Sequence, residues 1–351
     1  MSTKTDPFTV VYPSDGGACG MYRMILPGEA CKNVGKPVMV VPRPPQIAVD
    51  NEGKIREIST GNAEIVIFQR PATAQMAPAI KMLQAKGVVV VIDMDDSLSL
   101  IDPRNTVHKS YDPRLSHNMN WMHAAKACEM ADWITVTTPA LAEEYGAHGR
   151  VSIIPNYVPT KYLSITRPEN EVPVVTWAGF TGTHPGDLTQ TAGMINQALV
   201  ETGAAFMALG DLNIFQELKV RYRAPNFHVP FSGFQDYPRS LARADIGLVP
   251  LRNTPFNKGK SCLKALEYSS LGIVPVVSPT PDNMRFVELG GALVAEKPSD
   301  WHTIVKDLIL DTDKRNELSA QVRKVAADCT VESNWELWWD AWCHASDRRH
   351  Q

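Results

Sequence analysis

Three charged side chains fall at helical spacing in the segment Pro255–Ser278, namely Lys260, Lys264 and Glu267. In a helix that turns by about 100° per residue they share an arc of about 60°, and the opposite side of the helix is apolar. Two ammonium groups can bind the oxygens of a diphosphate. A carboxylate can accept hydrogen bonds from two neighbouring hydroxyls of a ribose. The spacing therefore predicts a ligand that carries a diphosphate and a ribose.

A polar loop with Gly259 precedes these residues, and Lys258 in this loop adds a further cation. A helix is predicted over Ser261–Leu271, because Gly272 ends it and a short apolar strand follows. Glycine lets the backbone approach a ligand closely. The alternative interpretation is an ordinary helix with a solvated face in front of a core strand.

A second glycine loop, in Trp177–Leu188, follows a strand that ends at Trp177. Gly179 and Gly182 lie in it, and a helix is predicted to begin near Pro185. Free amides at a helix N-terminus can bind an anion, although a plain capped turn would have the same sequence. The residues that we expect to face a diphosphate here are Gly179, Thr181, Gly182 and Thr183.

A third glycine loop, Ser14–Arg23, comes directly after the first predicted strand. Gly16 and Gly17 are predicted to open a helix that contains Arg23. The guanidinium of Arg23 can bind two phosphate oxygens at once. The glycines do not have the G-x-G-x-x-G spacing of a dinucleotide-binding loop, so we set that interpretation aside.

Three carboxylates, Asp93, Asp95 and Asp96, cluster where a buried strand ends, which is where α/β folds bind ligands. Three interpretations stay open. The carboxylates could orient an acceptor hydroxyl or take its proton. Asp93 and Asp95 could form a D-x-D site for a divalent ion. The three residues could also simply cap the following turn.

Short apolar runs alternate with amphipathic segments of helix length, which predicts parallel sheets covered by helices. Proline and polar residues interrupt the pattern at Tyr157–Pro173. We therefore expect an α/β protein of two doubly wound, Rossmann-like domains, over 1–160 and 171–330. The predicted strands are Thr9–Tyr12, Val38–Val41, Glu64–Phe68, Val88–Asp93, Trp133–Thr137, Val151–Ile154, Val172–Trp177, Ala205–Leu209, Asn226–Val229, Ile246–Val249, Val274–Val277 and Ala292–Val294.

The composition, with 44% hydrophobic and 21% charged residues, is that of a globular protein. The formal charge is −3, but Asn213–Lys264 holds nine Lys and Arg residues against three acidic ones, a local charge of +6. Such a window is compatible with an anionic partner. The scattered cysteines and the absence of a signal peptide or an apolar run of membrane length favour a cytoplasmic protein.

The run K-A-L-E-Y-S-S-L-G-I-V-P-V-V-S resembles the donor-site helix of GT-B glycosyltransferases, especially glycosyltransferase family 4. The pattern in that family is E-x7-E followed by A-x-G-x-P-V-V. The resemblance implies that Glu267 binds the ribose of a nucleotide sugar. The first glutamate, which would contact the transferred sugar, falls at Gly259, between Lys258 and Lys260.

The resemblance implies two Rossmann-like domains that face a cleft, with the tryptophan-rich C-terminal helix (331–347) crossing back to the N-terminal domain. It also implies sugar transfer with retention and without a required metal or other cofactor. Arg23, Lys260 and Lys264 would stabilise the departing diphosphate. The acceptor would enter past Asp93, Asp95 and Asp96.

The D-G-G…Y-R loop together with the D-x-D-D and K-S-x-x-K-x-L-E-Y segments looks like small glycosyltransferases encoded by bacteriophages. That resemblance implies a hydroxymethylated base in DNA as the acceptor, or else a protein or a glycan, in the host cytoplasm. Arg221 and Arg223 would be the clearest contacts to a DNA backbone. Two alternatives remain: a nucleotide-sugar epimerase of similar fold, and a catalytically silent sugar-nucleotide-binding protein.

Overall fold

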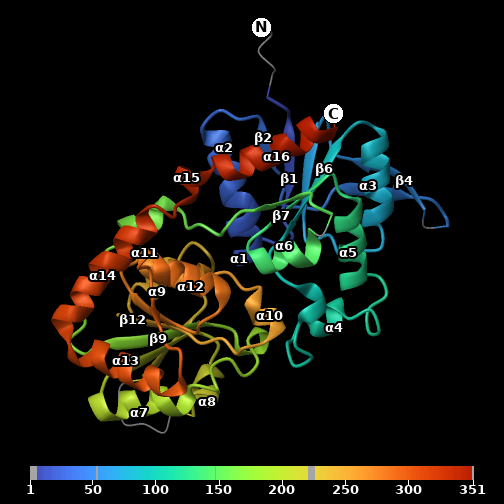
Figure 1. Cartoon of the computed structure of the whole chain (residues 1–351). Helices are drawn as coiled ribbons and strands as arrows, with labels where there is room; N and C mark the ends of the chain where they lie inside the picture. Colours follow the sequence, from blue (N-terminus) through green and yellow to red (C-terminus); the bar gives the residue numbers. More distant parts are fainter. Residues whose placement is uncertain (1–5, 53, 147, 220–225, 350–351) are drawn as a thin grey trace. The chain divides into compact units, whose positions relative to one another are not determined.

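The computed structural model describes residues 6–52, 54–146, 148–219 and 226–349. The chain forms two compact units. The first comprises residues 1–101, 107–156 and 331–351, and the second comprises 102–106 and 157–330. Each unit is built on a six-stranded parallel sheet (Figure 1).

The sheet of the first unit has the strand order β2-β1-β5-β6-β7-β8. Its central strands β5 and β6 are buried along their whole length, as expected for a parallel sheet that helices cover on both faces. The strands are β1 Thr9–Tyr12, β2 Val38–Val40, β5 Ile65–Gln69, β6 Val89–Met94, β7 Trp133–Val136 and β8 Val151–Ile153.

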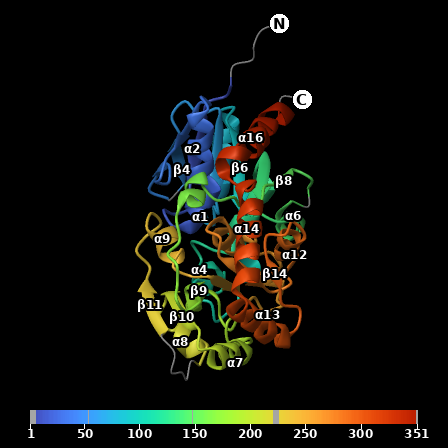
Figure 2. The ribbon, with the colours of Figure 1, turned by 90° about the vertical axis from the view of Figure 1, so that its left-hand side faces the viewer.

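The helices α2 and α16 lie on one side of this sheet, and α3 and α5 lie on the other (Figure 1). Figure 2 shows α16 beside α2. Trp338 and Trp342 of α16 are fully buried, so the C-terminal tryptophans serve as packing residues. The helices are α1 Ala18–Gly20, the π-helical turn η1 Met21–Ile25, α2 Leu26–Asn33, α3 Met76–Ala85, η2 Leu98–Leu100, α4 His108–Tyr111, α5 Trp121–Met130, α6 Pro139–Tyr145, α15 Val331–Asn334 and α16 Glu336–Arg349.

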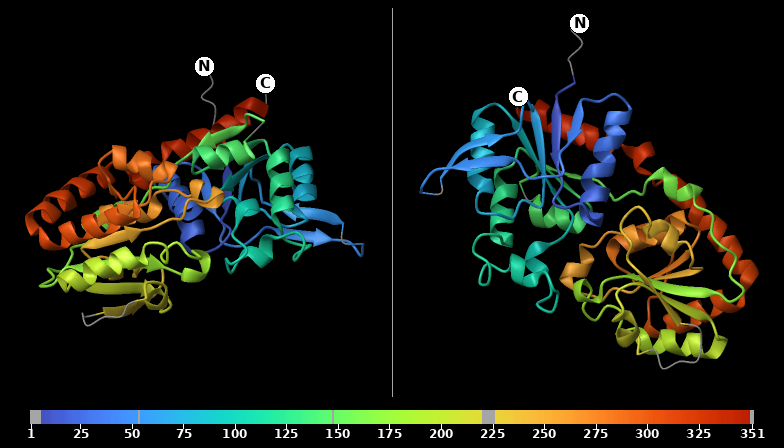
Figure 3. Two further views of the ribbon diagram at one scale, coloured as in Figure 1. Left: turned by 60° about the horizontal axis from the view of Figure 1, so that its bottom comes forward. Right: turned by 180° about the vertical axis from the view of Figure 1, so that it is seen from behind.

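An antiparallel hairpin of β3 (Gln46–Val49) and β4 (Ile55–Ser59) was not predicted from the sequence. It extends away from the six-stranded sheet (Figure 3). Among the described residues of the hairpin, only Ile55 and Ile58 have buried side chains, and β4 packs against α3. Ile47, Ala48 and Val49 are consecutive, and Ile55 and Ile58 are three positions apart, so the hairpin lacks the regular alternation of apolar and polar residues by which a strand is predicted.

The sheet of the second unit has the order β11-β10-β9-β12-β13-β14. Its strands are β9 Val174–Gly179, β10 Ala205–Gly210, β11 Asn226–Pro230, β12 Ile246–Val249, β13 Val274–Val277 and β14 Leu293–Val294. Its helices are η3 Thr160–Ser164, η4 Thr181–Thr183, α7 Ala192–Thr202, α8 Ile214–Glu217, α9 Tyr237–Leu241, α10 Pro255–Lys258, α11 Leu263–Ser270, α12 Pro281–Glu288, α13 Pro298–Leu310 and α14 Thr312–Ala327.

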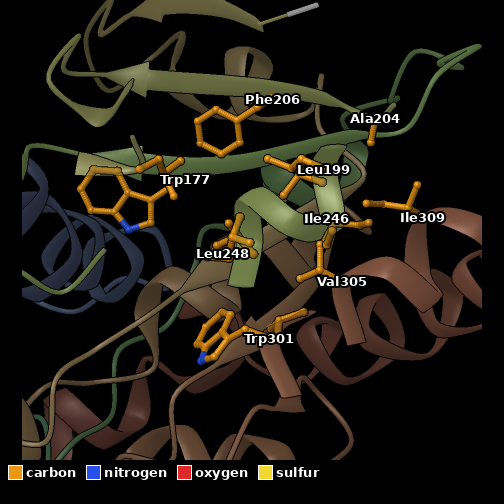
Figure 4. Close-up of a cluster of buried hydrophobic side chains, with 14 of the residues drawn as sticks. Trp177, Leu199, Ala204, Phe206, Ile246, Leu248, Trp301, Val305 and Ile309 are labelled. Carbon is orange, nitrogen blue, oxygen red and sulfur yellow. The ribbon is translucent and has the colours of Figure 1, made fainter. Parts of the chain in front are cut away.

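A hydrophobic core cluster of the second unit lies between the sheet and the helices α7 and α13 (Figure 4). Phe206 and Leu248 of the sheet meet Leu199 of α7 and Trp301 of α13, and all four are at most 3% exposed. β9 lies at the centre of this sheet, between β10 and β12, and is buried except at Gly179, where the strand ends.

The position of α11 depends on Tyr268 and Gly247. A Cβ atom on Gly247 of β12 would lie 2.4 Å from the ring of Tyr268, so only glycine lets that ring pack against the strand. The Tyr268 hydroxyl accepts a hydrogen bond of 3.1 Å from the amide of Ala178. Gly272, with φ of +70°, follows α11 where the chain turns into β13. These contacts fix the helix next to the end of β9.

All twelve predicted strands are present, each within two residues of its predicted ends, and the prediction of two Rossmann-like α/β sheets is confirmed. The prediction of a helix near Pro185 is wrong. The chain there forms the short turn η4 and further turns, and α7 begins only at Ala192. Within the described residues, no helix is both long and apolar enough to cross a membrane.

Candidate functional site

The side chain of Lys264 ends directly over the carboxyl end of β9. Its ammonium lies 4.5 Å from the centroid of the Trp177 ring. A Cβ atom at Gly179 would lie 3.2 Å from the same ammonium, and φ at Gly179 is +147°, a value that side-chain-bearing residues rarely adopt. Gly179 therefore allows both the turn of the chain and the approach of the cation, as expected for a glycine at a ligand site.

The ammonium of Lys264 is unusually easy to deprotonate. Burial lowers its pKa to about 8, the charge of Lys260 adds to this shift, and the carboxylates Glu267 and Asp187 oppose it. Lys264 thus interacts electrostatically with both Lys260 and Glu267, although Lys260 precedes helix α11 and does not share its face. The ammonium of Lys260 lies 4.4 Å from the centroid of the Phe256 ring. A bound anion would relieve the burial cost of the Lys264 ammonium.

His184 completes this end of β9. Its ring meets Trp177 edge-on at 5.7 Å, and its Nδ1 lies 3.2 Å from a carboxylate oxygen of Asp187. Burial and the charge of Lys264 lower the pKa of His184 to about 4. The imidazole is therefore neutral at pH 7 and can donate a hydrogen bond without adding charge.

Glu267 is only 7% exposed, and one of its oxygens accepts a hydrogen bond of 3.0 Å from the hydroxyl of Tyr237. Burial and the charge of Glu267 raise the pKa of Tyr237, so the phenol stays protonated as the donor. A carboxylate has about four acceptor positions, so Glu267 can accept further hydrogen bonds while Tyr237 orients it. Sequence reasoning missed this role of Tyr237.

Two exposed aromatic residues extend the site. Phe180 and Phe231, each directly after a strand of the sheet, are 49% and 47% exposed. Their ring centroids are 6.0 Å apart, and Phe231 lies 6.0 Å from Tyr237. Exposed rings at strand ends offer a surface for a planar base. Their position after strands was visible in the sequence, but their exposure was not. We call Lys260, Lys264, Glu267, Tyr237, Phe180 and Phe231 the β9 site.

The turn η4 offers fewer free donors than the sequence suggested. The amide and hydroxyl of Thr181 both donate to Asp211, at 3.2 and 2.6 Å, and the amide and hydroxyl of Thr183 donate to the Phe180 carbonyl. A Cβ atom on Gly182 would lie 2.7 Å from the Thr106 side chain, so glycine is needed here for the chain to pack closely against Thr106. The structure thus places Gly179 at the β9 site. The amides and hydroxyls of Thr181 and Thr183, in contrast, already donate hydrogen bonds within the protein.

A cavity of about 470 Å³ lies at the carboxyl ends of β12, β13 and β14. Lys258 and Arg252 line this cavity, whereas Lys264 and Glu267 do not. Arg252 is paired with Asp102 at 2.6 Å, and its Nε lies 3.7 Å from Asp187. The structure therefore separates Lys258 from the residues around β9 with which it was predicted to act.

In the first unit, the glycine loop folds around Asp15. One carboxylate oxygen of Asp15 accepts hydrogen bonds from the amides of Gly17 and Gly20, at 2.8 and 3.2 Å. A Cβ atom on Gly20 would lie 1.8 Å from the Asp15 carbonyl oxygen, so no other residue fits there. Gly16 is exposed and has open space beside it. The protein's own carboxylate thus occupies the amide of Gly17, which together with Gly16 was predicted to bind the donor.

Arg23 has internal partners as well. It is fully buried, its Nη2 lies 2.6 Å from Asp93, and its Nη1 donates to the carbonyl of Ile154 at 2.6 Å. Thr135 donates a further hydrogen bond of 2.7 Å to Asp93. Burial raises the pKa of Asp93, and Arg23 and Thr135 oppose this shift. Arg23 and Asp93 thus form a fully buried ion pair whose hydrogen bonds are made within the protein.

Asp95 and Asp96 are both held by Arg70, which pairs with Asp95 and lies 2.9 Å from Asp96. Arg70 adopts a left-handed backbone with φ of +47°, strained for a non-glycine residue. The two carboxylates are half-buried at the carboxyl edge of the sheet, where a substrate could reach them. Within the described residues, no group of three or more His, Cys, Asp and Glu side chains is placed to hold a metal ion.

In the structure, the positive charge of the basic window Asn213–Lys264 is partly offset by carboxylates from outside the window. Arg252 is paired with Asp102 and Asp187, which both lie outside the window. Arg243 stacks over the ring of Phe227 at 5.0 Å. Arg221 and Arg223 lie outside the described residues.

No protein-family model matches the sequence, and no curated protein matches it either. Several solved structures do match. The catalytic domain of starch synthase IV from Arabidopsis thaliana, bound to ADP and acarbose, has 12% identity and a TM-score of 0.63, over 98% of this chain and 100% of that chain. WaaG, a glycosyltransferase involved in lipopolysaccharide biosynthesis, has 13% identity and a TM-score of 0.61, over 95% and 99%.

HepE from Anabaena in complex with UDP has 11% identity and a TM-score of 0.60, over 93% of this chain and 97% of that chain. At such low identities the likeness concerns the fold. The chain has the α/β fold of the GT-B glycosyltransferases, along nearly its whole length.

Proposed function

We propose that the protein is a glycosyltransferase that binds a nucleoside-diphosphate sugar at the β9 site and transfers the sugar to an acceptor hydroxyl. The observation that carries the proposal is the pairing of Lys264 over Gly179 with Glu267 held by Tyr237. A cation at the strand end suits a diphosphate, and an oriented carboxylate nearby suits a ribose. The GT-B fold of the chain supports this assignment.

In this proposal each side chain of the β9 site has one task. Lys264 and Lys260 bind the diphosphate, Glu267 binds the ribose hydroxyls, and Phe180 and Phe231 stack against the base. The bond between the anomeric carbon and the diphosphate oxygen breaks while a bond to the acceptor oxygen forms. The ammonium groups stabilise the negative charge on the leaving diphosphate, an effect worth about 3 kcal/mol for one well-placed donor.

We further propose that transfer proceeds with retention of the anomeric configuration, as the resemblance of the α11 segment to family 4 implies. The acceptor then attacks from the face that the diphosphate leaves, and its proton passes to the departing phosphate. In the first unit, Asp95 and Asp96 are the half-buried carboxylates suited to orient the acceptor hydroxyl.

A hydroxymethylated base in DNA remains a candidate acceptor because of the basic window Asn213–Lys264. The described part of the window gives it limited support, since Arg252 is neutralised by two carboxylates. A DNA acceptor predicts binding that weakens steeply with salt, because each phosphate contact releases counterions. Transfer that does not depend on salt would exclude DNA.

One residue supports a second candidate, a protein that binds a sugar nucleotide without transferring the sugar. Gly259 occupies the position at which the family pattern has the glutamate that contacts the transferred sugar. Gly259 directly follows helix α10 and is buried. A silent protein would bind the nucleotide sugar and leave it intact with every acceptor. An epimerase would convert it without any acceptor.

The test begins with thermal-shift titrations of uridine, adenosine, guanosine, cytidine and thymidine diphosphates. The nucleotide that binds best is then supplied as its sugar conjugates with hydroxymethylated DNA, protein and glycan acceptors, and release of the diphosphate is measured. We expect binding of at least one diphosphate and release that requires one acceptor class. If none of the five diphosphates binds, the proposal is wrong.

A further inference from the structure

Three cavities of the first unit meet at one tryptophan, Trp121, the first residue of α5. Their volumes are about 360, 700 and 410 Å³, and Trp121 lines all three. Ser99 and Pro113 each line two of them. Each volume lies in the range of about 300–1,000 Å³ that small-molecule sites have. We call the three cavities together the Trp121 groove.

The side chain of Trp121 is half-buried, and its backbone belongs to the capped first turn of helix α5. The side chain of Asn120 caps α5 by accepting hydrogen bonds from the amides of Met122 and His123, at 3.0 and 3.2 Å. This cap fixes the backbone at Trp121. No residue in the described part of the chain hydrogen-bonds to the indole N–H. The ring therefore presents a pre-organised apolar surface with one unused donor.

Carboxylates surround this ring. Asp112, Glu129 and Glu144 each line at least one of the three cavities. Asp112 is paired with Arg114 at 2.6 Å, Glu129 with Lys126 at 2.8 Å, and Glu144 accepts a hydrogen bond of 2.8 Å from Ser99.

These partners orient the carboxylates without using all of their acceptor positions, of which each has about four. Burial lowers the pKa of His148 at the edge of the groove, so its ring is neutral at pH 7 and adds no positive charge.

We propose that the Trp121 groove binds a saccharide chain. A sugar ring has an apolar face of C–H groups, which packs on an indole, and a rim of hydroxyls, which donate to carboxylates. Three cavities around one ring provide room for more than one sugar unit. Arg114 and Lys126 also line the groove, and each is paired with one of these carboxylates, so the lining has no excess positive charge to attract the phosphates of a nucleic acid.

The groove adjoins the loop that carries Asp95 and Asp96. Ser99 belongs to η2, which follows these residues within four positions. The Tyr145 hydroxyl donates to the carbonyl of Asp96 at 3.1 Å and accepts from the amide of Leu98 at 3.0 Å. A saccharide bound in the groove thus lies next to the carboxyl edge of the first sheet. The inference goes beyond the proposed function and does not depend on it, since binding requires no nucleotide sugar.

The test is a titration of the full chain, without nucleotide, with maltotriose, cellotriose, chitotriose and mannotriose, followed by saturation-transfer NMR. The variants are Trp121→Ala and Glu144→Gln. The matched control is Trp335→Ala, which removes another half-buried tryptophan of the first unit, outside the groove. Thermal unfolding and titration with the best nucleoside diphosphate verify that each variant is folded.

We expect at least one trisaccharide to bind, with a dissociation constant of about 10 mM or lower. Trp121→Ala should weaken this binding by about tenfold or more, because the packing surface is lost, while Trp335→Ala leaves it unchanged. If Trp121→Ala does not fold, Trp121→Phe replaces it and should show intermediate affinity.

Three results would overturn the proposal: none of the four trisaccharides binds, binding persists in a folded Trp121→Ala variant, or a single-stranded DNA oligonucleotide displaces the bound saccharide. Because the titration contains no sugar donor, a failure here differs from a failure of nucleotide binding.

Discussion

Raising the pH from 7 to 9 should weaken the binding of a nucleoside diphosphate by about tenfold, because of Lys264. With a pKa of about 8 in the free protein, this ammonium is about 90% protonated at pH 7 and about 10% protonated at pH 9. The diphosphate should return the pKa toward its usual 10.5, so binding takes up a proton in this range. The affinity then falls by about 1.4 kcal/mol.

The same shift should affect the stability of the free protein. Because the folded state holds the Lys264 proton less tightly than the unfolded state, the unfolded state binds more protons between pH 8 and 10.5. The contribution of this group to the free energy of unfolding therefore rises with pH across that window. At pH 7, Lys264→Met should stabilise the ligand-free protein by about 1–3 kcal/mol and should abolish most of the affinity for the diphosphate.

Isothermal titration calorimetry at pH 7, 8 and 9, in two buffers with different ionisation enthalpies, measures both the affinity and the proton uptake. The second phosphate pKa of the ligand, about 6, lies below this range and does not interfere. His184, with a pKa of about 4, stays neutral throughout. An affinity that is constant from pH 7 to 9, or an equal pH dependence in Lys264→Met, would refute the reasoning.

Three further predictions concern the same site. Glu267→Gln should weaken nucleoside diphosphate binding by about ten- to a hundredfold more than it changes the binding of inorganic diphosphate, which has no ribose, since the variant removes a charge-assisted acceptor for the ribose hydroxyls. Gly179→Ala should destabilise the protein by about 1–2 kcal/mol in chemical denaturation, because φ is +147° there, and should weaken nucleotide binding by displacing the Lys264 ammonium. Transfer activity should survive dialysis against EDTA, because ammonium groups bind the diphosphate, and a loss restored by magnesium or manganese would contradict this.

The fold was predictable because its signals are local. Buried strands such as Val89–Met94 and Val274–Val277 are continuous apolar runs, and such runs between amphipathic helices predict a parallel sheet. The position of Lys264 and Glu267 on one helix was also predictable from their spacing, whereas Lys260 precedes helix α11 and does not lie on it. The hairpin β3–β4 was missed because few of its side chains are buried.

The residues that could not be predicted depend on contacts between distant segments. A glycine loop before Arg23 suggested a phosphate ligand, but the sequence does not reveal that Asp93, seventy positions later, lies 2.6 Å from it. The role of Tyr237 depends on its distance from Glu267, thirty positions away. Likewise, the exposure of Phe180 and Phe231 depends on how tightly neighbouring loops cover them.

The most direct test of the central claim is a crystal structure of the full chain with the nucleoside diphosphate that binds best. We predict that the diphosphate lies within hydrogen-bonding distance of the Lys264 ammonium and the ribose within hydrogen-bonding distance of Glu267. The base should lie against Phe180 or Phe231. A nucleotide bound instead in the cavity lined by Arg252 and Lys258, or anywhere else away from Glu267, would contradict the account.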